Sequence, residues 1–221
     1  MPDGVGIFGG TFDPVHVAHL RAAEDVREAL DLSEIRFVPA AVPPHKDARA
    51  VTAPAERLRM LELATAGIPD FRVWPVELER QGPSYSIDTI RALRAEIGPS
   101  RRIAFILGRD AFAEFDTWKE HAAIFALCDV VVMSRPPQRE DLTIADIPVA
   151  ARQAFCYDPA SGSFHHESGR RVIPLSVVPL DISATDIRAR LAAGRSIRFL
   201  VPAAVEAYLA STRLYRSTHA S

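Results

Sequence analysis

The sequence is poor in cysteine and lacks any long apolar segment. Its 221 residues include two cysteines, Cys128 and Cys156, and neither belongs to a CxxC pair. Because a disulfide-stapled secreted domain uses more cysteines, we expect two reduced, buried thiols in a cytoplasmic protein. The N-terminus shows no basic segment followed by an apolar one, so we expect no signal peptide. No run approaches the roughly 18 apolar residues of a spanning helix, so we expect no membrane contact.

Charge of one sign is not in excess either. The formal net charge is -2, and charged residues make up 24% of the chain. Because nucleic acids and anionic membrane surfaces attract strongly basic proteins, we expect neither as a partner. Hydrophobic residues make up 48%, which is ordinary for a globular protein with one sizeable core.

Two common nucleotide-binding motifs are also missing. There is no GxxxxGK[ST], which excludes a Walker P-loop. The order Gly6-Ile7-Phe8-Gly9-Gly10 is not GxGxxG, and no acidic residue ends the second apolar run at Phe37–Ala40. A dinucleotide-binding dehydrogenase is therefore disfavoured.

What the chain does contain is a repeated alternation of short apolar runs and helical spacing. The runs predict buried strands at Val5–Phe8, Ile35–Val38, Phe71–Val76, Ile103–Leu107, Val130–Met133 and Val172–Val178. Helical spacing covers His16–Leu30, Arg57–Ala66 and Ile87–Ile97, and Thr117–Glu120 fits a capping box before another helix. Alternation of this kind predicts an α/β fold, a Rossmann-like open doubly wound parallel sheet with helices on both faces.

We expect a single domain over residues 1–221, with a C-terminal helical part from about residue 183. Ser183 fits a helix N-cap, Gly194 would end that helix, and Pro202–Leu209 predicts a last one. Between the fifth and last strands, Pro136–Gly169 is irregular and polar. We interpret it as a surface excursion.

The stretch after the first strand combines glycines with histidines. Gly9 and Gly10 permit positive φ and close approach of a ligand, and Asp13 and Pro14 suit a helix start. His16 and His19 follow in the sequence HVAH, with the first turn's free N–H groups beside them, which indicates a polyphosphate site. Two alternatives remain open here: a capping histidine in a plain strand-turn-helix, or a metal held by both imidazoles.

A second capped helix start lies far along the chain, at Ile182–Arg188. Its N-terminus can attract an anion, and Arg188 can form a forked contact with phosphate oxygens. An ordinary surface helix is the alternative.

Together these stretches resemble the nucleotidylyltransferase superfamily, which is marked by a (T/H)xGH element and an ISSTxxR-like element. Further matching stretches follow the other strands: Pro43–Lys46, Gly82–Thr89, Leu107–Asp110 with Trp118, and Ser134–Pro136. In this order they resemble the bacterial nicotinate mononucleotide adenylyltransferases over nearly the whole chain. Such enzymes join ATP to nicotinate mononucleotide in NAD synthesis, so the resemblance implies these two substrates.

The resemblance assigns roles to individual residues. ATP would contact Gly9, Gly10, Thr11, Phe12, His16, His19, Gly108, Asp110, Ser183, Thr185 and Arg188. Nicotinate mononucleotide would contact His45, Lys46, Tyr85, Ser86, Trp118 and Arg135. The catalytic groups would be His16, His19, Lys46 and Arg188, with the imidazoles favoured in protonated form by the phosphates. We expect Mg²⁺ bound through ATP phosphates rather than protein side chains, and a homo-oligomer is possible.

The attacking group in this reaction is a phosphate monoester, whose second pKa is about 6, so no general base is needed. Departures from the family pattern are Ala18 for glycine, Ala184 for serine, Ser86 for threonine and Arg109 for a small residue. The alternatives are the same chemistry on nicotinamide mononucleotide or phosphopantetheine, a nucleotide-binding module without turnover, and the disfavoured dehydrogenase.

Overall fold

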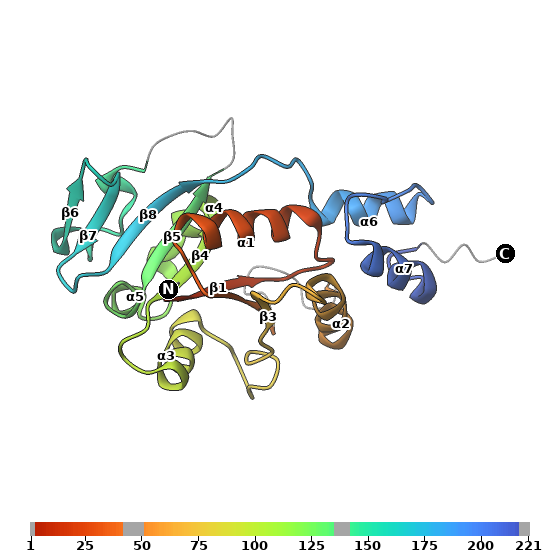
Figure 1. Cartoon of the computed structure of the whole chain (residues 1–221), viewed down its shortest axis with the longest axis horizontal. Helices are drawn as coiled ribbons and strands as arrows, with labels where there is room; N and C mark the ends of the chain where they lie inside the picture. The colour runs from red at the N-terminus through yellow and green to blue at the C-terminus, as the bar shows by residue number, and fades with distance from the viewer. Residues whose placement is uncertain (1–2, 42–50, 135–141, 217–221) are drawn as a thin grey trace.

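The computed structural model describes residues 3–41, 51–134 and 142–216, and within these ranges eight strands form one sheet in the order β3-β2-β1-β4-β5-β8-β7-β6 (Figure 1). The parallel strands are β1 (Val5–Gly10), β2 (Glu34–Pro39), β3 (Phe71–Val73), β4 (Ile103–Gly108), β5 (Asp129–Ser134) and β8 (Arg171–Ser176). The predicted Rossmann-like sheet is thereby confirmed.

One edge of the sheet differs from the prediction. The Pro136–Gly169 region is more than a surface excursion, because β6 (Phe155–Asp158) and β7 (Ser163–His166) form a hairpin that pairs antiparallel with β8. Gly162, with φ +64°, supplies the left-handed residue of its turn. The sheet is therefore mixed. The hairpin also places Cys156 in solvent on an edge strand, so of the two free thiols only Cys128 is buried as expected.

Helices cover both faces of the sheet. One layer contains α1 (Val17–Ala29), α2 (Pro54–Thr65), α6 (Ala184–Ala192) and α7 (Ala203–Thr212), and the other contains α3 (Ser86–Ile97), α4 (Arg109–Ala113) and α5 (His121–Leu127). Short 3₁₀ turns lie at Phe115–Thr117, Ile144–Asp146 and Arg152–Ala154. Helices α6 and α7 lie at the end of the molecule opposite the hairpin (Figure 1). In the described part of the chain, no helix is long and apolar enough to cross a membrane.

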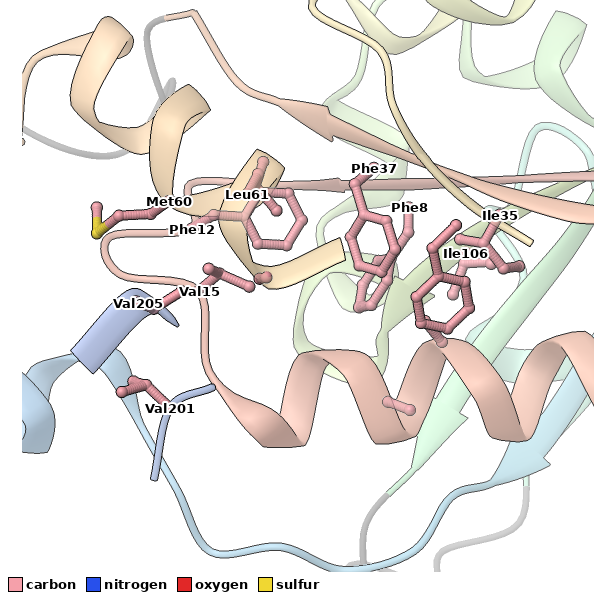
Figure 2. Packing of buried hydrophobic residues seen from close by; sticks show 14 of the residues in the cluster. Phe8, Phe12, Val15, Ile35, Phe37, Met60, Leu61, Ile106, Val201 and Val205 are labelled. Carbon is pink, nitrogen blue, oxygen red and sulfur yellow. The ribbon is translucent and has the colours of Figure 1, made fainter. Parts of the chain in front are cut away.

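The core is divided by the sheet into two apolar clusters, which explains why the strand sequences are nearly continuous in apolar residues. In Figure 2 the rings of Phe8 and Phe37, from neighbouring strands, lie together above helix α1. Their ring centroids are 5.7 Å apart. On the other face, Ile7 and Phe105 pack against α3 and α5.

Local signals at helix starts gave one correct and one wrong prediction. Ser183 caps α6, because its Oγ accepts the N–H of Asp186 at 3.1 Å. Thr117 caps nothing: its hydroxyl donates to the Glu114 carbonyl inside a 3₁₀ turn. Helix α5 begins only at His121, after Glu120 turns the chain with φ +51°.

Candidate active site

The predicted site residues that follow the first and fourth strands lie at the neighbouring carboxyl ends of β1 and β4. These two strands are neighbours, with Phe8 opposite Ile106, and the chain leaves β1 toward β2 on the other side. The strand order therefore reverses between β1 and β4, and open α/β sheets bind ligands at such a point. Gly9 and Gly10, which end β1, and Gly108, which ends β4, lie at this edge.

The two histidines form a stacked pair at the start of α1. The helix begins at Val17, so His16 is the N-cap, and the prediction that Asp13 caps it is wrong. The backbone N–H of His16 donates to Nδ1 of His19 at 3.2 Å. Their ring centroids are 3.7 Å apart, with the planes 24° from parallel. His16 is buried, whereas His19 is partly exposed and forms the solvent-facing side of the pair.

This geometry decides which nitrogen of His19 can donate to a ligand. Because Nδ1 accepts a backbone N–H in this arrangement, Nε2 is the ring nitrogen that can donate to a ligand. The protonated form, which the sequence suggested for imidazoles beside phosphates, stays a prediction.

The helix start offers fewer backbone donors than we expected. The N–H of Val17 donates to the Leu200 carbonyl at 3.0 Å, and that of His19 donates to the His16 carbonyl at 3.0 Å. Two of the amides that an anion would use are thus already paired. The imidazoles consequently carry more of any anion binding at this end.

The loop before the histidines presents backbone to the sheet edge. A Cβ added at Gly9 would meet no heavy atom within 4 Å, so this exposed position leaves open space for a ligand. Neither Gly9 nor Gly10 uses the positive φ that glycine permits, and Phe12 takes that conformation with φ +50°. The buried Phe12 ring meets His19 edge-on, with centroids 5.1 Å apart, and so supports the imidazole from below. Thr11 is partly buried beside it.

Arg188 reaches the first loop from the other end of the chain. Its Nη1 donates to the Asp13 carbonyl at 2.7 Å across 175 residues, and its Nη2 donates to Thr185 Oγ1 at 3.2 Å. The two motifs that the sequence singled out separately are therefore one cluster. Ser183 lies next to it, although its hydroxyl donates to Asp186 Oδ2 at 2.7 Å as part of the cap.

The residues predicted for the nicotinate side form a second group on the α3 and α5 layer. Tyr85 is the N-cap of α3 and is 42% exposed, and Ser86 is the first residue of that helix. Trp118 packs on Phe115, with ring centroids 5.0 Å apart. Lys119 joins the two segments, because its Nζ lies 4.5 Å from the centre of the Tyr85 ring.

Gly108 ends β4 and Asp110 is exposed in the first turn of α4, so both lie at the predicted edge. Arg109 forms an ion pair with Asp146 Oδ1 at 3.2 Å. It also lines a cavity of about 460 Å³ between Ser134 and the β6–β7 hairpin. Among the residues that the structure describes, no predicted site residue lines that cavity, and the described candidate residues lie at the open strand edge. His45, Lys46 and Arg135 lie outside the described residues.

Sequence reasoning missed the side chains that hold this edge together. Arg57, on α2, is 1% exposed and donates to the carbonyls of Thr11, Ala40 and Thr52 at 2.8, 2.8 and 3.0 Å. Burial lowers the pKa of its guanidinium, and the nearby Asp13 carboxylate opposes that effect. The available signal was a charged residue inside a helix that packs on the core.

Glu77 is a second missed residue, in the loop before α3. Burial raises the pKa of its carboxyl group, while the hydrogen bond from Thr89 Oγ1 at 2.9 Å and the Ala41 backbone N–H act in the opposite direction. Glu77 thereby ties the start of the nicotinate-side helix to the segment that follows β2.

The described side chains do not form a metal site. Within residues 3–41, 51–134 and 142–216, no three His, Cys, Asp or Glu side chains are grouped as a metal ion requires. The stacked histidines thus have no third ligand among the described residues.

Comparison with known proteins identifies the family. The sequence profile of the cytidylyltransferase-like family matches residues 7–190. A relative from Geobacter sp. (strain M21), named "probable nicotinate-nucleotide adenylyltransferase", is 47% identical over 96% of this chain and 97% of its own length. The chain belongs to the nicotinate-nucleotide adenylyltransferase family. A relative with the same name from Geobacter sulfurreducens is 48% identical over 95% of this chain and 97% of its own length.

Solved structures share the fold of this adenylyltransferase family member. The Plasmodium falciparum nicotinic acid mononucleotide adenylyltransferase complexed with NaAD superposes with a TM-score of 0.69, covering 96% of this chain and 97% of that chain. The same enzyme complexed with APC gives a TM-score of 0.68. At 16% identity this likeness concerns the fold alone. The resemblance drawn from the sequence motifs is confirmed by the curated relatives.

Proposed function

We infer that the chain catalyses adenylyl transfer from ATP to nicotinate mononucleotide, giving nicotinate adenine dinucleotide and pyrophosphate. The observation that carries this inference is the contact between Arg188 and the Asp13 carbonyl, because it brings two anion-binding helix starts to one strand edge. The close relatives that share nearly the whole chain have this activity in their name.

We propose direct in-line attack by the phosphate of the mononucleotide on the α-phosphorus of ATP. A P–O bond forms to the attacking oxygen, and the bond from the α-phosphorus to the oxygen bridging to the β-phosphate breaks. Pyrophosphate leaves with the electron pair of that bond. The attacking monoester is largely ionised at neutral pH, so the protein has to position two anions and stabilise charge rather than remove a proton.

In this scheme the Nε2–H group of His19 donates a hydrogen bond to a phosphate oxygen of ATP, and His16, stacked on it, fixes the plane of the ring. Arg188 holds the departing phosphates. Its Nη1 donates to the Asp13 carbonyl, and this bond fixes the position of the guanidinium. The remaining N–H donors are then directed at the phosphates. Lys46 and His45 stay predictions for neutralising the triphosphate. Gly9 leaves room for the nucleotide next to the backbone.

On the nicotinate side, Trp118 would stack on the pyridinium ring, and Tyr85 and Ser86 at the start of α3 would receive its carboxylate. Mg²⁺ fits as an ion held by phosphate oxygens and water, because the described residues include no group of three His, Cys, Asp or Glu side chains that could hold it. Bound there, it would neutralise charge on the phosphates. The metal, a cytoplasmic location and a homo-oligomer all stay predictions.

The test is pyrophosphate release by the purified protein with ATP, Mg²⁺ and one acceptor at a time, with product identified by chromatography. We expect release that depends on nicotinate mononucleotide. Nicotinamide mononucleotide and phosphopantetheine are the matched acceptors, and a clear preference for either would contradict the substrate assignment. Binding of ATP without release by any acceptor would indicate a nucleotide-binding module.

A further inference from the structure

The C-terminal segment after α7 places one tyrosine against the first loop. The Tyr215 hydroxyl donates to Asp13 Oδ1 at 2.5 Å across 202 residues. Its ring and Leu214 pack against the same apolar cluster as α1 and α2. Arg213 and Tyr215 both have left-handed backbone, with φ of +56° and +64°. This conformation is uncommon in non-glycine residues and has a free-energy cost that surrounding contacts must offset. The position of Tyr215 is therefore specified and is not that of a loose tail.

Asp13 connects this tyrosine to the predicted phosphate site. The residue is only 4% exposed, and its Oδ2 accepts the backbone N–H of Thr52 at 3.4 Å. Its backbone carbonyl is the group that accepts the Arg188 guanidinium at 2.7 Å. Asp13 thus contacts Tyr215 through its side chain and Arg188 through its backbone carbonyl. A contact that fixes the position of Asp13 therefore also fixes the position of the Arg188 guanidinium.

Arg57 fixes the loop from the other side. It holds the Thr11 carbonyl two residues before Asp13, and the Thr52 carbonyl belongs to the same residue whose N–H reaches Asp13. Asp13 therefore has two supports: the buried guanidinium of Arg57, which holds the neighbouring backbone, and the Tyr215 hydroxyl, which binds its carboxylate. Of these two supports, the tyrosine is the one whose contact can be removed by taking away a single oxygen.

We propose that Tyr215 is a positioning residue for adenylyl transfer, which acts through Asp13 to set the place of Arg188 against the phosphates of ATP. Tyr215 itself touches no reacting atom. The proposal rests on the proposed function, because it concerns the phosphate end of that same site. It gives the C-terminal segment a catalytic consequence in addition to its packing.

The hydroxyl remains a donor under ordinary conditions. Burial raises the pKa of Tyr215 above its usual value, and the hydrogen bond to Asp13 raises it further. The phenol therefore keeps its proton over the pH range in which such an enzyme is assayed.

The test compares Tyr215→Phe with a matched control, Tyr208→Phe. Tyr208, on α7, makes the same kind of bond, from its hydroxyl to Glu56 Oε2 at 2.6 Å, but Glu56 lies on α2, and within the described part of the chain its side chain has no hydrogen bond or ion pair to a predicted site residue. We expect Tyr215→Phe to lower kcat/KM for ATP about tenfold, the size of one hydrogen bond to a charged group, and to leave KM for the mononucleotide unchanged. Tyr208→Phe should stay within about twofold of the wild type. Urea unfolding of both variants measures the structural cost.

Three outcomes would overturn the proposal: equal losses of kcat/KM in the two variants, an unchanged Tyr215→Phe enzyme, or a loss that follows KM for the mononucleotide alone. The path through Arg188 is tested in the Arg188→Lys background. In that background, the additional substitution Tyr215→Phe should lower kcat/KM for ATP by less than about twofold, since the effects of residues that act as a unit are not additive. Full additivity would contradict that path. A wild-type enzyme that uses another acceptor would overturn the proposed substrate. The ratio of kcat/KM for ATP between Tyr215→Phe and the wild type, measured with that acceptor, would still decide the role of Tyr215.

Discussion

Replacement of His19 separates the two tasks that the structure gives this side chain. His19 occupies the third position of α1, where its Nδ1 accepts the N-cap N–H, and its Nε2 carries the proton that we assign to the phosphate. Glutamine is a preferred residue at this helix position because its side-chain oxygen can accept the same N–H. His19→Gln therefore keeps the cap and removes the imidazole donor, whereas His19→Ala removes both.

The expected sizes follow from the contacts. The capping bond, at 3.2 Å, is long, and His19→Ala also removes the edge contact with Phe12. A cap and one ring contact together are worth about 1–2 kcal/mol of unfolding free energy. Loss of a donor that stabilises the charge of a transition state lowers kcat by about 10²–10³-fold. His19→Ala should show both losses. His19→Gln should show the same loss of kcat and a smaller loss of stability, because it keeps the capping bond and loses the ring contact with Phe12.

Two assays check this prediction: pyrophosphate release at saturating ATP and nicotinate mononucleotide, and urea unfolding of the same preparations. A His19→Gln enzyme with near wild-type kcat would refute the donor role. A fall in kcat that matched the fraction of unfolded protein in both variants would show that the histidine acts only through the helix start.

Three further predictions concern the frame around the site. Ser183→Ala should lower the unfolding free energy by about 1 kcal/mol through loss of the α6 cap, and a urea midpoint equal to that of the wild type would contradict the cap. Phe37→Ala should cost about 3–5 kcal/mol, because this fully buried ring packs between Phe8 and Phe71, and thermal unfolding measures it; a cost below 1 kcal/mol would mean that the cavity collapses. The carboxyl group of Glu77 has its pKa raised by burial above the ordinary 4.5, so its contribution to stability falls as pH rises from 4.5 through the higher folded-state value. The stability of Glu77→Gln relative to the wild type should therefore increase across that window in urea titrations, and a difference independent of pH would refute the assignment.

Much of the frame could be predicted because its signals are local. Apolar runs marked the six parallel strands, and helical spacing marked α1 to α3, with ends within a few residues of those observed. The cap at Ser183 was correct because capping depends on residues three apart. The β6–β7 hairpin was missed because its strands are four residues long and carry polar side chains, so no alternating pattern reveals them.

Within the candidate site, the sequence alone determined which residues we assign to the chemistry. The sequence showed motifs at the glycines, His16, His19 and the Ser183–Arg188 element. Short spacings between particular residue types can be recognised without three-dimensional information. Only the tertiary structure decided how they are held. Arg188 reaches Asp13, and Tyr215 reaches the same residue, across 175 and 202 residues. Such contacts arise from strand order and helix packing, which local sequence patterns do not encode.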